Sequence, residues 1–514
     1  MAQATENLEG TWEPLFWVAP DTDMKKVLDQ ALDLAAGKPE ILTRIAADQD
    51  ALGIAKKRLR LADQRWARAQ MPTLPGLSLE EVTEKPVDDV SLLEGRPRLP
   101  ADVVYVFSVL RGYLGSISDQ DARDRLLDSV TLQLYLGRWN LVFPGWTTIL
   151  ENLNAISQGT RSFILDAQLE IILEEELDDF SQALLDSTAV EANSAWPTDS
   201  GILLALLERA FRTSQKLDVF GLANIPQWWM PWWLKKLHKL HFRISNVAGK
   251  PKSKGKLKKY YRQFLRTVQT MLDYLVSECI GRDPLQEAAP RPPSQLLVLE
   301  RLWDQLVQDV SEAGAVYQYT EERLFEGKVR PAEAKKLSLS DESAAFIKKG
   351  QRNSIIGYKP QLARSGEGFV TALSVPQGNA ADAPQLVPLV EDVRQHTGIL
   401  PQQVSVDDGY ASQEGRNQLL EVGVKEVSIS GAKGKELTPE EDWNSTVYQL
   451  LRKGRSAVES LIFVLKFRFA FGRVRRRGLE EVQAELWEKI LAYNFARMVF
   501  VRQAREETPL DKAA

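Results

Sequence analysis

The stretch from Val404 to Lys466 constrains the fold most, because it joins a strand that ends in acids to a helix that carries another acid. Its first part, QVSVDDGYAS, is a β-branched run ending in two carboxylates, which is typical of a buried strand that stops at a sheet edge. Its second part, RKGRSAVESLIFVLK, is predicted to be helical, with Arg455, Glu459 and Lys466 within roughly 40° of one another on one face. That face could also be an ordinary solvated stripe. The spacing between the two acids, however, leaves room for one intervening strand.

The composition favours a globular protein of two or three domains, since 44% of its 514 residues are apolar and 26% are charged. The net charge of -5 does not by itself indicate a nucleic-acid partner, but the charge is unevenly spread. A single cysteine, Cys279, excludes an internal disulfide framework and a zinc site of the CxxC type, which fits a reducing cytosol. The N-terminus lacks a signal-peptide pattern, and no uncharged stretch reaches membrane-spanning length. We therefore expect a soluble, intracellular protein without a membrane segment.

Helical spacing dominates the first third of the chain. Residues 1–100 are predicted to form an N-terminal helical region that ends in a proline- and glycine-rich linker, and residues 101–176 a second helical domain. This part could be a DNA-binding or dimerisation module, or a helical support packed on a catalytic core. We expect a discontinuous α/β core at residues 177–198 and 337–502. A helical insertion is expected at residues 199–336, and a tail at residues 503–514.

The run FSQALLDSTAVEANSAWPTDS has the pattern of a strand with one acid, Asp186, in its middle. A buried carboxylate is costly unless it has a hydrogen-bond partner, a cation or a metal. Asp186 is therefore a candidate functional residue, although a paired structural acid would give the same pattern.

A basic and aromatic stretch lies within the helical insertion. From Lys235 to Arg266 there are twelve Lys or Arg and no acid, with several tryptophans and tyrosines close by. Basic residues interleaved with aromatics suit a phosphate backbone and unstacked bases. The alternative is an amphipathic helix with tryptophans in the core, followed by a solvated lysine loop. The predicted DNA contacts here are Trp228, Trp229, Lys250, Lys252, Lys254 and Lys256.

Strand and helix patterns alternate after Ile355. IIGYKPQLARS and GEGFVTALSVPQGN are predicted to form a hairpin through the turn SGEG. Two helix–strand repeats follow, and then the helix that carries Glu459. The order predicts an α/β fold: a mixed sheet of the ribonuclease-H-like kind, with three antiparallel strands, two parallel strands and flanking helices. Asp186 would lie on the first strand, Asp407 on the fourth, and Glu459 on a helix after the fifth.

The segments LDSTAVEAN, VSVDDGYAS and RxxxExxxxxxK, in this order, resemble the catalytic motifs of DDE-type bacterial insertion-sequence transposases. The phrase DSTAVEANSAWPTDSG is similar to the ISNCY-type branch, and the last segment to the Y-R-E-K signature group. The sequence departs from that signature at one position, because Arg452 stands where the tyrosine is expected and Tyr448 lies one turn earlier.

The resemblance implies that Asp186, Asp407 and Glu459 are catalytic metal ligands for two Mg²⁺ or Mn²⁺ ions, roughly 3.5 to 4 Å apart. Asp407 is preferred to Asp408 because it is the last polar position of the strand on its face. Arg455 and Lys466 would contact terminal phosphates, although Arg455 could instead pair with Glu459. From Arg452 to Arg477 there are nine Lys or Arg against one acid, a cationic field suited to DNA. Further predicted DNA contacts are Arg452, Lys359, Arg473 and Arg475.

The function implied is a magnesium-dependent transposase that binds the terminal inverted repeats of its element and catalyses strand cleavage and strand transfer. The partners implied are double-stranded DNA, as element ends and as target, and a second copy of the chain on that DNA. The expected location is the bacterial cytoplasm, in association with the nucleoid. Two alternatives stay open: an inactive relative that only binds DNA, and a nuclease of the same fold without strand transfer.

Overall fold

The structure is a computed structural model, which describes residues 22–69, 98–115, 119–129, 144–194, 196–220, 229–280, 290–331, 335–348 and 354–506. Packing divides the chain into two compact units. The first unit comprises Met1–Leu52, Arg96–Asn193 and Ser343–Ala514, and the second comprises Gly53–Gly95 and Ser194–Glu342. The five-part division expected from the sequence stays a prediction.

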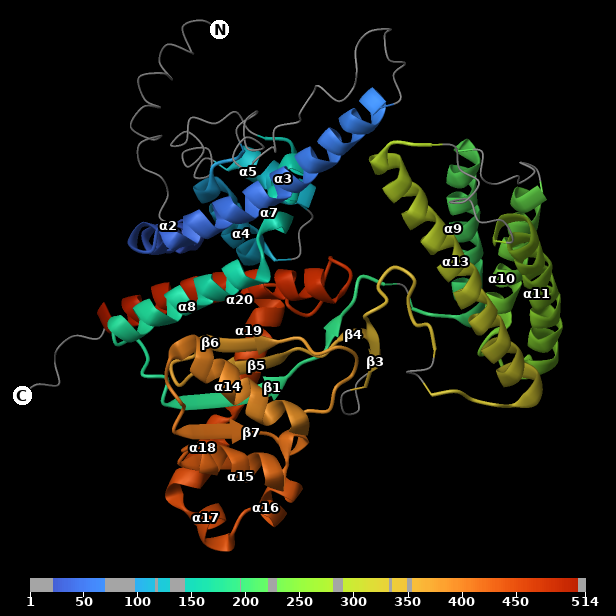
Figure 1. The fold of residues 1–514 in the computed structure, drawn as a ribbon. Coiled ribbons are helices and arrows are strands. Elements are labelled where there is room, and N and C mark those ends of the chain that lie inside the picture. The colour runs from blue at the N-terminus through green and yellow to red at the C-terminus, as the bar shows by residue number, and fades with distance from the viewer. Residues whose placement is uncertain are drawn as a thin grey trace, which may run out of the picture. The chain divides into compact units, whose positions relative to one another are not determined.

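A mixed five-stranded sheet forms the centre of the first unit (Figure 1). Its strands, in spatial order, are β6 (Val370–Ser374), β5 (Gln361–Arg364), β1 (Gln182–Ser187), β7 (Gln403–Val406) and β8 (Glu426–Ile429). β1, β5 and β6 pair antiparallel, while β7 and β8 run parallel to β1. The predicted meander of three strands followed by two parallel strands is confirmed. The arrangement is consistent with an α/β fold of the ribonuclease-H-like kind.

The predicted strand IIGYKPQLARS is interrupted. Ile355–Tyr358 forms β4, which pairs with β2 (Val190–Glu191) and β3 (Ala345–Ile347) in a separate three-stranded sheet. Pro360 has no N–H group to donate to a ladder, so the chain leaves one sheet at this point and enters the other as β5. The prediction of one continuous strand was therefore wrong, whereas the hairpin of β5 and β6 through Ser365–Phe369 is confirmed.

Helices cover both faces of the five-stranded sheet. α14 (Leu386–Thr397) and α15 (Gln413–Glu421) lie on one face, where Val404 and Val406 share a core with Leu389 and Val393. α14 ends at Gly398, which adopts the left-handed conformation that glycine accommodates best. α18, α19 and α20 contact the other face, and the Ser405 hydroxyl there donates to the Leu451 carbonyl of α18. The short helices α16 (Ala432–Leu437) and α17 (Glu440–Asn444) follow β8.

The helix predicted around Glu459 is divided in two. α18 spans Thr446–Gly454 and α19 spans Ser456–Arg468, with Arg455 between them. Gly454 and Ser456 flank this residue, and both residue types are weak helix formers, which explains the interruption. Arg455 keeps helical dihedral angles, so its relation to Glu459 one turn later is preserved.

Six described helices precede β1, and three of them pack on the last helix, α20 (Leu479–Glu506). The six are α2 (Asp23–Gly37), α3 (Glu40–Ala69), α4 (Ala101–Leu114), α5 (Asp119–Asp128), α7 (Trp146–Ala155) and α8 (Gln158–Glu174). α20 contacts α2, α4 and α8, and every residue from Glu485 to Phe495 is buried. The amphipathic sequence EVQAELWEKILAYNFARMVFVRQ predicts a helix that buries its apolar side against the core, whereas charged residues of this helix are buried as well. It continues to Glu506, into the expected tail, and residues 507–514 lie outside the described residues.

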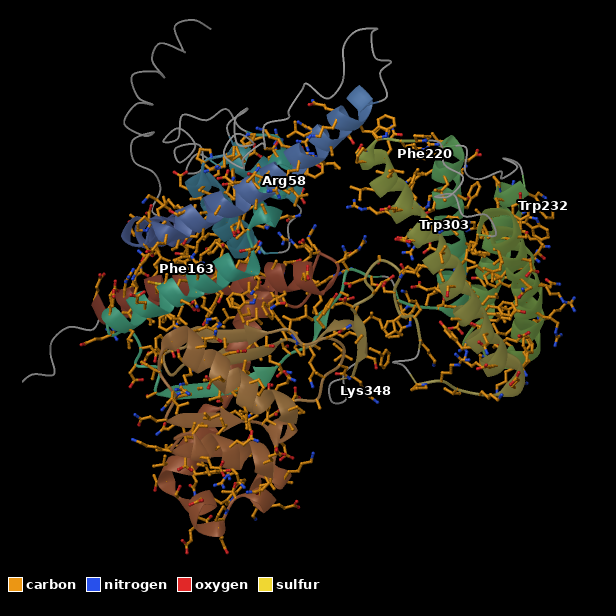
Figure 2. The ribbon with its side chains drawn as sticks, viewed as in Figure 1. Arg58, Phe163, Phe220, Trp232, Trp303 and Lys348 are labelled. Carbon is orange, nitrogen blue, oxygen red and sulfur yellow. The ribbon has the colours of Figure 1, made fainter. Side chains whose placement is uncertain are left out.

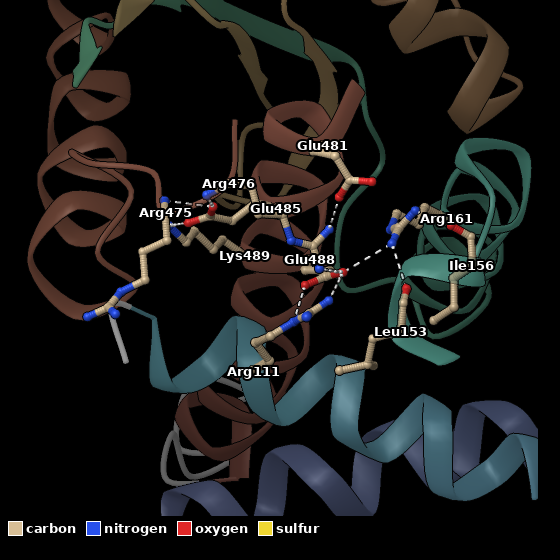
Figure 3. A network of polar contacts seen from close by, with 10 residues as sticks. All are labelled: Arg111, Leu153, Ile156, Arg161, Arg475, Arg476, Glu481, Glu485, Glu488 and Lys489. Atoms are coloured by element: carbon tan, nitrogen blue, oxygen red, sulfur yellow. Dashed lines mark hydrogen bonds and ion pairs between the residues drawn. The ribbon is translucent and has the colours of Figure 1, made fainter. Parts of the chain in front are cut away.

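Charged residues of α20 can be buried because they are paired (Figure 3). Glu488 accepts hydrogen bonds from Arg111 of α4 at 2.6 and 2.8 Å, and from Arg161 of α8 at 3.1 Å. Arg476, from the basic stretch before α20, adds a contact at 3.4 Å. Burial opposes ionisation of Glu488, but the charges of Arg111, Arg476 and Arg161 outweigh it and lower the pKa of this carboxyl to about 2. The network ties α4, α8 and α20 together.

The second unit is a helical bundle. Its principal helices are α9 (Asp199–Val219), α10 (Trp229–Val247), α11 (Lys254–Leu275) and α13 (Pro293–Glu321), with the π-helical turns η3 (Val276–Ile280) and η4 (Glu322–Glu326). Leu203, Leu237, Phe264 and Leu306 are among the buried residues that these helices contribute to one shared core. Within the described parts of both units, no helix has the length and apolar character needed to cross a membrane.

Candidate functional site

Asp186 and Asp407 lie at the carboxyl ends of neighbouring parallel strands. The register of β1 and β7 pairs Leu184 with Ser405, and its continuation by two residues brings Asp186 opposite Asp407. Paired strands are about 4.8 Å apart, so the two carboxylates are near neighbours. Both side chains belong to the face contacted by α18 and α19, since Ala183 and Val404, each an odd number of residues away, belong to the core on the opposite face.

The two adjacent acids after β7 have different partners. Asp407 accepts a hydrogen bond from the Gly409 amide at 2.9 Å and begins the short 3₁₀ helix η7 (Asp408–Tyr410). Asp408 accepts from the Gly434 amide of α16 at 3.0 Å. This geometry gives Asp408 a role in holding the loop after β8.

Glu459 reaches the same region through an arginine. Arg455 donates to the Glu459 carboxylate at 2.5 Å, and another nitrogen of its guanidinium lies 3.7 Å from Asp186. The Glu459 side chain is 58% exposed, whereas Asp186 is buried. The ion pair between Arg455 and Glu459, which the sequence left open as an alternative, is therefore present. The same guanidinium also lies beside Asp186 and so links Glu459 to it.

The other signature positions have local contacts. The Lys466 ammonium donates to the Ala189 carbonyl at 3.0 Å, just beyond β1. The Arg452 guanidinium lies 4.2 Å from the centre of the Trp443 ring. Tyr448 is fully buried and its hydroxyl contacts both backbone groups of Ile429 at 3.0 Å. Tyr448 thus anchors α18 to β8.

Predicted DNA-contacting residues of the first unit differ in accessibility. Arg473 and Arg475 are exposed, and Figure 3 shows the Arg475 side chain directed away from the Glu488 network. Lys359 has only a 12% exposed side chain and forms an ion pair with Asp382 at 2.8 Å. A phosphate contact by Lys359 would require that pair to open.

Asp382 is a further acid at this edge that the sequence pattern did not indicate. It follows β6, which runs parallel to β1, so its strand ends at the same edge as β1 and β7. The sequence GNAADAPQ resembles an ordinary helix start, and only the sheet order would have revealed the position.

The basic stretch of the second unit is solvent-accessible. All twelve Lys and Arg between Lys235 and Arg266 are exposed. Trp232 is 57% exposed and projects from α10 (Figure 2). The Lys236 ammonium lies 5.6 Å from the centre of its ring and 4.4 Å from that of Trp233, an arrangement typical of cation–π contacts. Trp228 lies outside the described residues, and for Trp229 the structure defines only the start of α10.

The two histidines with HxxH spacing on α10 each contact a polar side chain of α9. His238 contacts Glu208 at 2.5 Å, and His241 contacts the Ser200 hydroxyl at 2.9 Å. Burial, followed by the charge of His238, lowers the pKa of His241.

The side chains of this site have the chemistry that a divalent cation requires. Asp186 and Asp407 supply hard oxygen ligands from neighbouring strands, which suits Mg²⁺ or Mn²⁺. In the described parts of the chain, no three acidic, histidine or cysteine side chains are already gathered as a metal-binding group. Glu459 is exposed and held by Arg455, so it would complete the set by exchanging that partner. The residues present therefore fit such an ion.

Residues 326–495 match the family model described as "Transposase DDE domain". The matched segment contains Asp407 and Glu459, and it begins after β1, so it does not include Asp186. Neither a curated protein nor a solved structure matches the chain. The family match supports a transposase of the DDE type.

Proposed function

We propose that this protein is a DDE transposase that binds the terminal inverted repeats of a bacterial insertion sequence and catalyses metal-dependent strand cleavage and strand transfer. The observation that carries the proposal is the register of β1 and β7, which brings Asp186 opposite Asp407, with Arg455 joining Glu459 to the same place. The family match to residues 326–495 supports the reaction class. The sequence resemblance further suggests the ISNCY-type branch and the Y-R-E-K group.

Asp186, Asp407 and Glu459 would hold two Mg²⁺ or Mn²⁺ ions, which activate the attacking water or 3′-hydroxyl and stabilise the leaving oxygen. The chain supplies the geometry for this chemistry. The strand-end acids are fixed by the sheet, whereas Glu459 is carried by an exposed helix face and can change partner. Arg455 neutralises Asp186 and Glu459 in the absence of substrate, and the same guanidinium can bind a DNA phosphate when one arrives.

The surrounding cations would bring DNA to the acids. Arg473 and Arg475 are exposed close in sequence to α19, and the exposed Lys235–Arg266 stretch offers a separate cationic surface on the second unit. Phosphate contacts of this kind fix position and orientation rather than sequence. We propose that a second copy of the chain joins on DNA when two element ends are brought together, in the nucleoid of a bacterial cell.

The proposal is tested with the purified full chain and a duplex that carries the inverted repeats flanking its own gene. We expect cleavage with Mg²⁺ or Mn²⁺, and binding with little cleavage in Ca²⁺, because calcium accepts looser coordination. Joining of the cut 3′ end to a second duplex distinguishes a transposase from a nuclease without strand transfer. Binding without any cleavage in Mg²⁺ would support an inactive relative, and full cleavage in excess EDTA would contradict the metal mechanism.

A further inference from the structure

A hydrogen bond crosses the first strand of the sheet immediately beside the candidate acids. Tyr410, three residues after Asp407, donates from its hydroxyl to the side-chain oxygen of Gln361 at the start of β5. Both side chains are fully buried. Because β1 lies between β5 and β7 in the sheet, this bond spans β1 at Ser187, the residue paired with Gln361.

Asp382 extends this contact into a buried polar network. The Gln361 amide nitrogen donates to the Asp382 carboxylate at 3.0 Å, so its oxygen is left to accept from Tyr410. Lys359 donates to the same carboxylate oxygen at 2.8 Å and to the Ala380 carbonyl at 3.1 Å. Asp382 therefore fixes the orientation of the Gln361 amide.

The network also touches the turn that carries Asp407. A Cβ atom built on Gly409 would lie 3.0 Å from an Asp407 carboxylate oxygen and 3.1 Å from an Asp382 carboxylate oxygen. These two oxygens are consequently within about 6 Å of each other. Burial raises the pKa of the Tyr410 hydroxyl, and the charges of Asp382, Asp186 and Asp407 raise it further.

The Tyr410–Gln361 contact lies on the opposite face of the sheet from the side chains of Asp186 and Asp407. Tyr410 belongs to the core of the α14 face, and Gln361 shares that face with Ala363 two residues later. Asp186 and Asp407 project toward the other face, where Arg455 lies. Contacts on the α14 face of the sheet can set the separation of two strand ends, and hence of the acids on the other face, without touching a substrate.

We infer that Tyr410, Gln361 and Asp382 form a clamp across β1 that fixes the separation of Asp186 and Asp407, and so act as positioning residues for the cation site. This inference rests on the proposed function. Partners that orient the ligands of a metal typically change metal affinity by about 10- to 100-fold when they are removed.

The test is a titration of the full chain with Mn²⁺, in which the electron paramagnetic resonance signal of the free ion measures how much Mn²⁺ is bound. Tyr410→Phe keeps the ring and removes the hydroxyl that bonds Gln361, and Asp382→Asn keeps the shape and removes the charge. Both variants are expected to weaken Mn²⁺ binding by about tenfold. Neither change is expected to alter binding of element-end DNA in Ca²⁺.

Tyr493→Phe is the matched control. Tyr493 is also buried, and its hydroxyl donates at 2.7 Å to Gly368, in the turn at the opposite end of β5. This variant should resemble Tyr410→Phe in thermal stability while it keeps wild-type Mn²⁺ affinity.

The outcomes separate the clamp from the proposed function. The clamp is supported if the wild-type protein binds Mn²⁺, Tyr410→Phe binds it more weakly, and Tyr493→Phe binds it as the wild type does. Wild-type affinity in Tyr410→Phe, or an equal loss in Tyr493→Phe, overturns the clamp and leaves the proposed function standing. A wild-type protein that binds no Mn²⁺ and cuts no DNA overturns both.

Discussion

Asp407 and Asp408 are neighbouring residues of the same type that have different hydrogen-bond partners. Asp407 is capped by the Gly409 amide and faces the region of Asp186, while Asp408 bonds the Gly434 amide of α16. Gly431 leaves the space that the Asp408 carboxylate occupies, since a Cβ there would lie within 2.7 Å of its atoms. The strand alternation that distinguished the two acids in the sequence agrees with these contacts.

Asp407→Asn should reduce strand cleavage by orders of magnitude and leave binding of element ends nearly unchanged. A carboxamide keeps the shape of the side chain but loses the charge that neutralises a cation. Asp408→Asn should retain substantial cleavage, with a loss of stability of about 1 kcal/mol or less because an amide oxygen can still accept from Gly434. Cleavage rates and gel-shift affinities of the two variants, measured side by side, decide this. An active Asp407→Asn with an inactive Asp408→Asn would reverse the assignment.

The sequence could predict that Asp186 and Asp407 end neighbouring strands, but not which cations and further acids lie beside them. Strand and helix patterns assign Asp186 and Asp407 to strands and Glu459 to a helix, and the resemblance to DDE-type transposases implies that they form one site. The Arg455 bridge to Asp186 depends on how α19 packs on β1, and the position of Asp382 depends on the sheet order. Such contacts join residues far apart in sequence, so local periodicity carries no information about them.

Helices and strands were predictable where their local signals were strong. The glycine after α14 and the alternation in β7 mark their elements clearly. The division of the Ile355–Arg364 stretch between two sheets was not predictable, because Pro360 is compatible with an edge strand as well as with a break. The burial of α20 on all sides was not predicted, because charged residues in a helix usually indicate an exposed face. Here the charged residues Glu488 and Lys489 are buried because they are paired.

Glu488→Gln should destabilise the first unit by about 3 kcal/mol at neutral pH, because three arginines lose their shared counterion. The pKa of Glu488 is lowered on folding, so its contribution is fully present above its ordinary value of 4.5 and disappears as pH falls toward about 2. Urea unfolding at several pH values should therefore show a difference between wild type and variant that shrinks below pH 4.5.

Glu481→Gln provides the control for this network. Glu481 contacts the same Arg476 at 3.2 Å, but its side chain is 47% exposed. An exposed ion pair contributes little, so its loss should change stability by less than about 1 kcal/mol at any pH. Equal effects of the two variants, or a Glu488→Gln effect that does not depend on pH, would contradict the buried network.

The exposed lysines between α10 and α11 and at the start of α11 predict a salt-dependent contribution to DNA binding. Replacing Lys250, Lys252, Lys254 and Lys256 together by glutamate should weaken binding. It should also lower the slope of log affinity against log salt by about 0.9 for each DNA phosphate that the variant no longer neutralises. The corresponding four-arginine variant keeps the charges and should preserve the slope. If affinity and slope are unchanged in the glutamate variant, the stretch is only a solvated surface.

Considered as a whole, the chain carries its candidate site on segments that are far apart in sequence. Asp186 precedes residues 194–342 of the second unit, while Asp407 and Glu459 follow them. The family match begins at residue 326, so it reaches two of the three acids. The third is connected to them by the pairing of β1 with β5 and β7. The mixed strand order could be inferred from the alternation of elements, whereas the small second sheet could not, because its strands are too short to give a pattern.

The central claim is that Asp186, Asp407 and Glu459 work as one metal-dependent site. It is tested most directly by single-turnover cleavage of pre-bound element ends in Mg²⁺, using Asp186→Asn, Asp407→Asn, Glu459→Gln and the double variant of the two aspartates. Residues that act as a unit are not additive, so each single variant should lose at least about 10³-fold in rate and the double variant little more. All four variants should bind the ends as the wild type does. Near wild-type cleavage by any single variant, or losses that multiply in the double variant, would contradict the account.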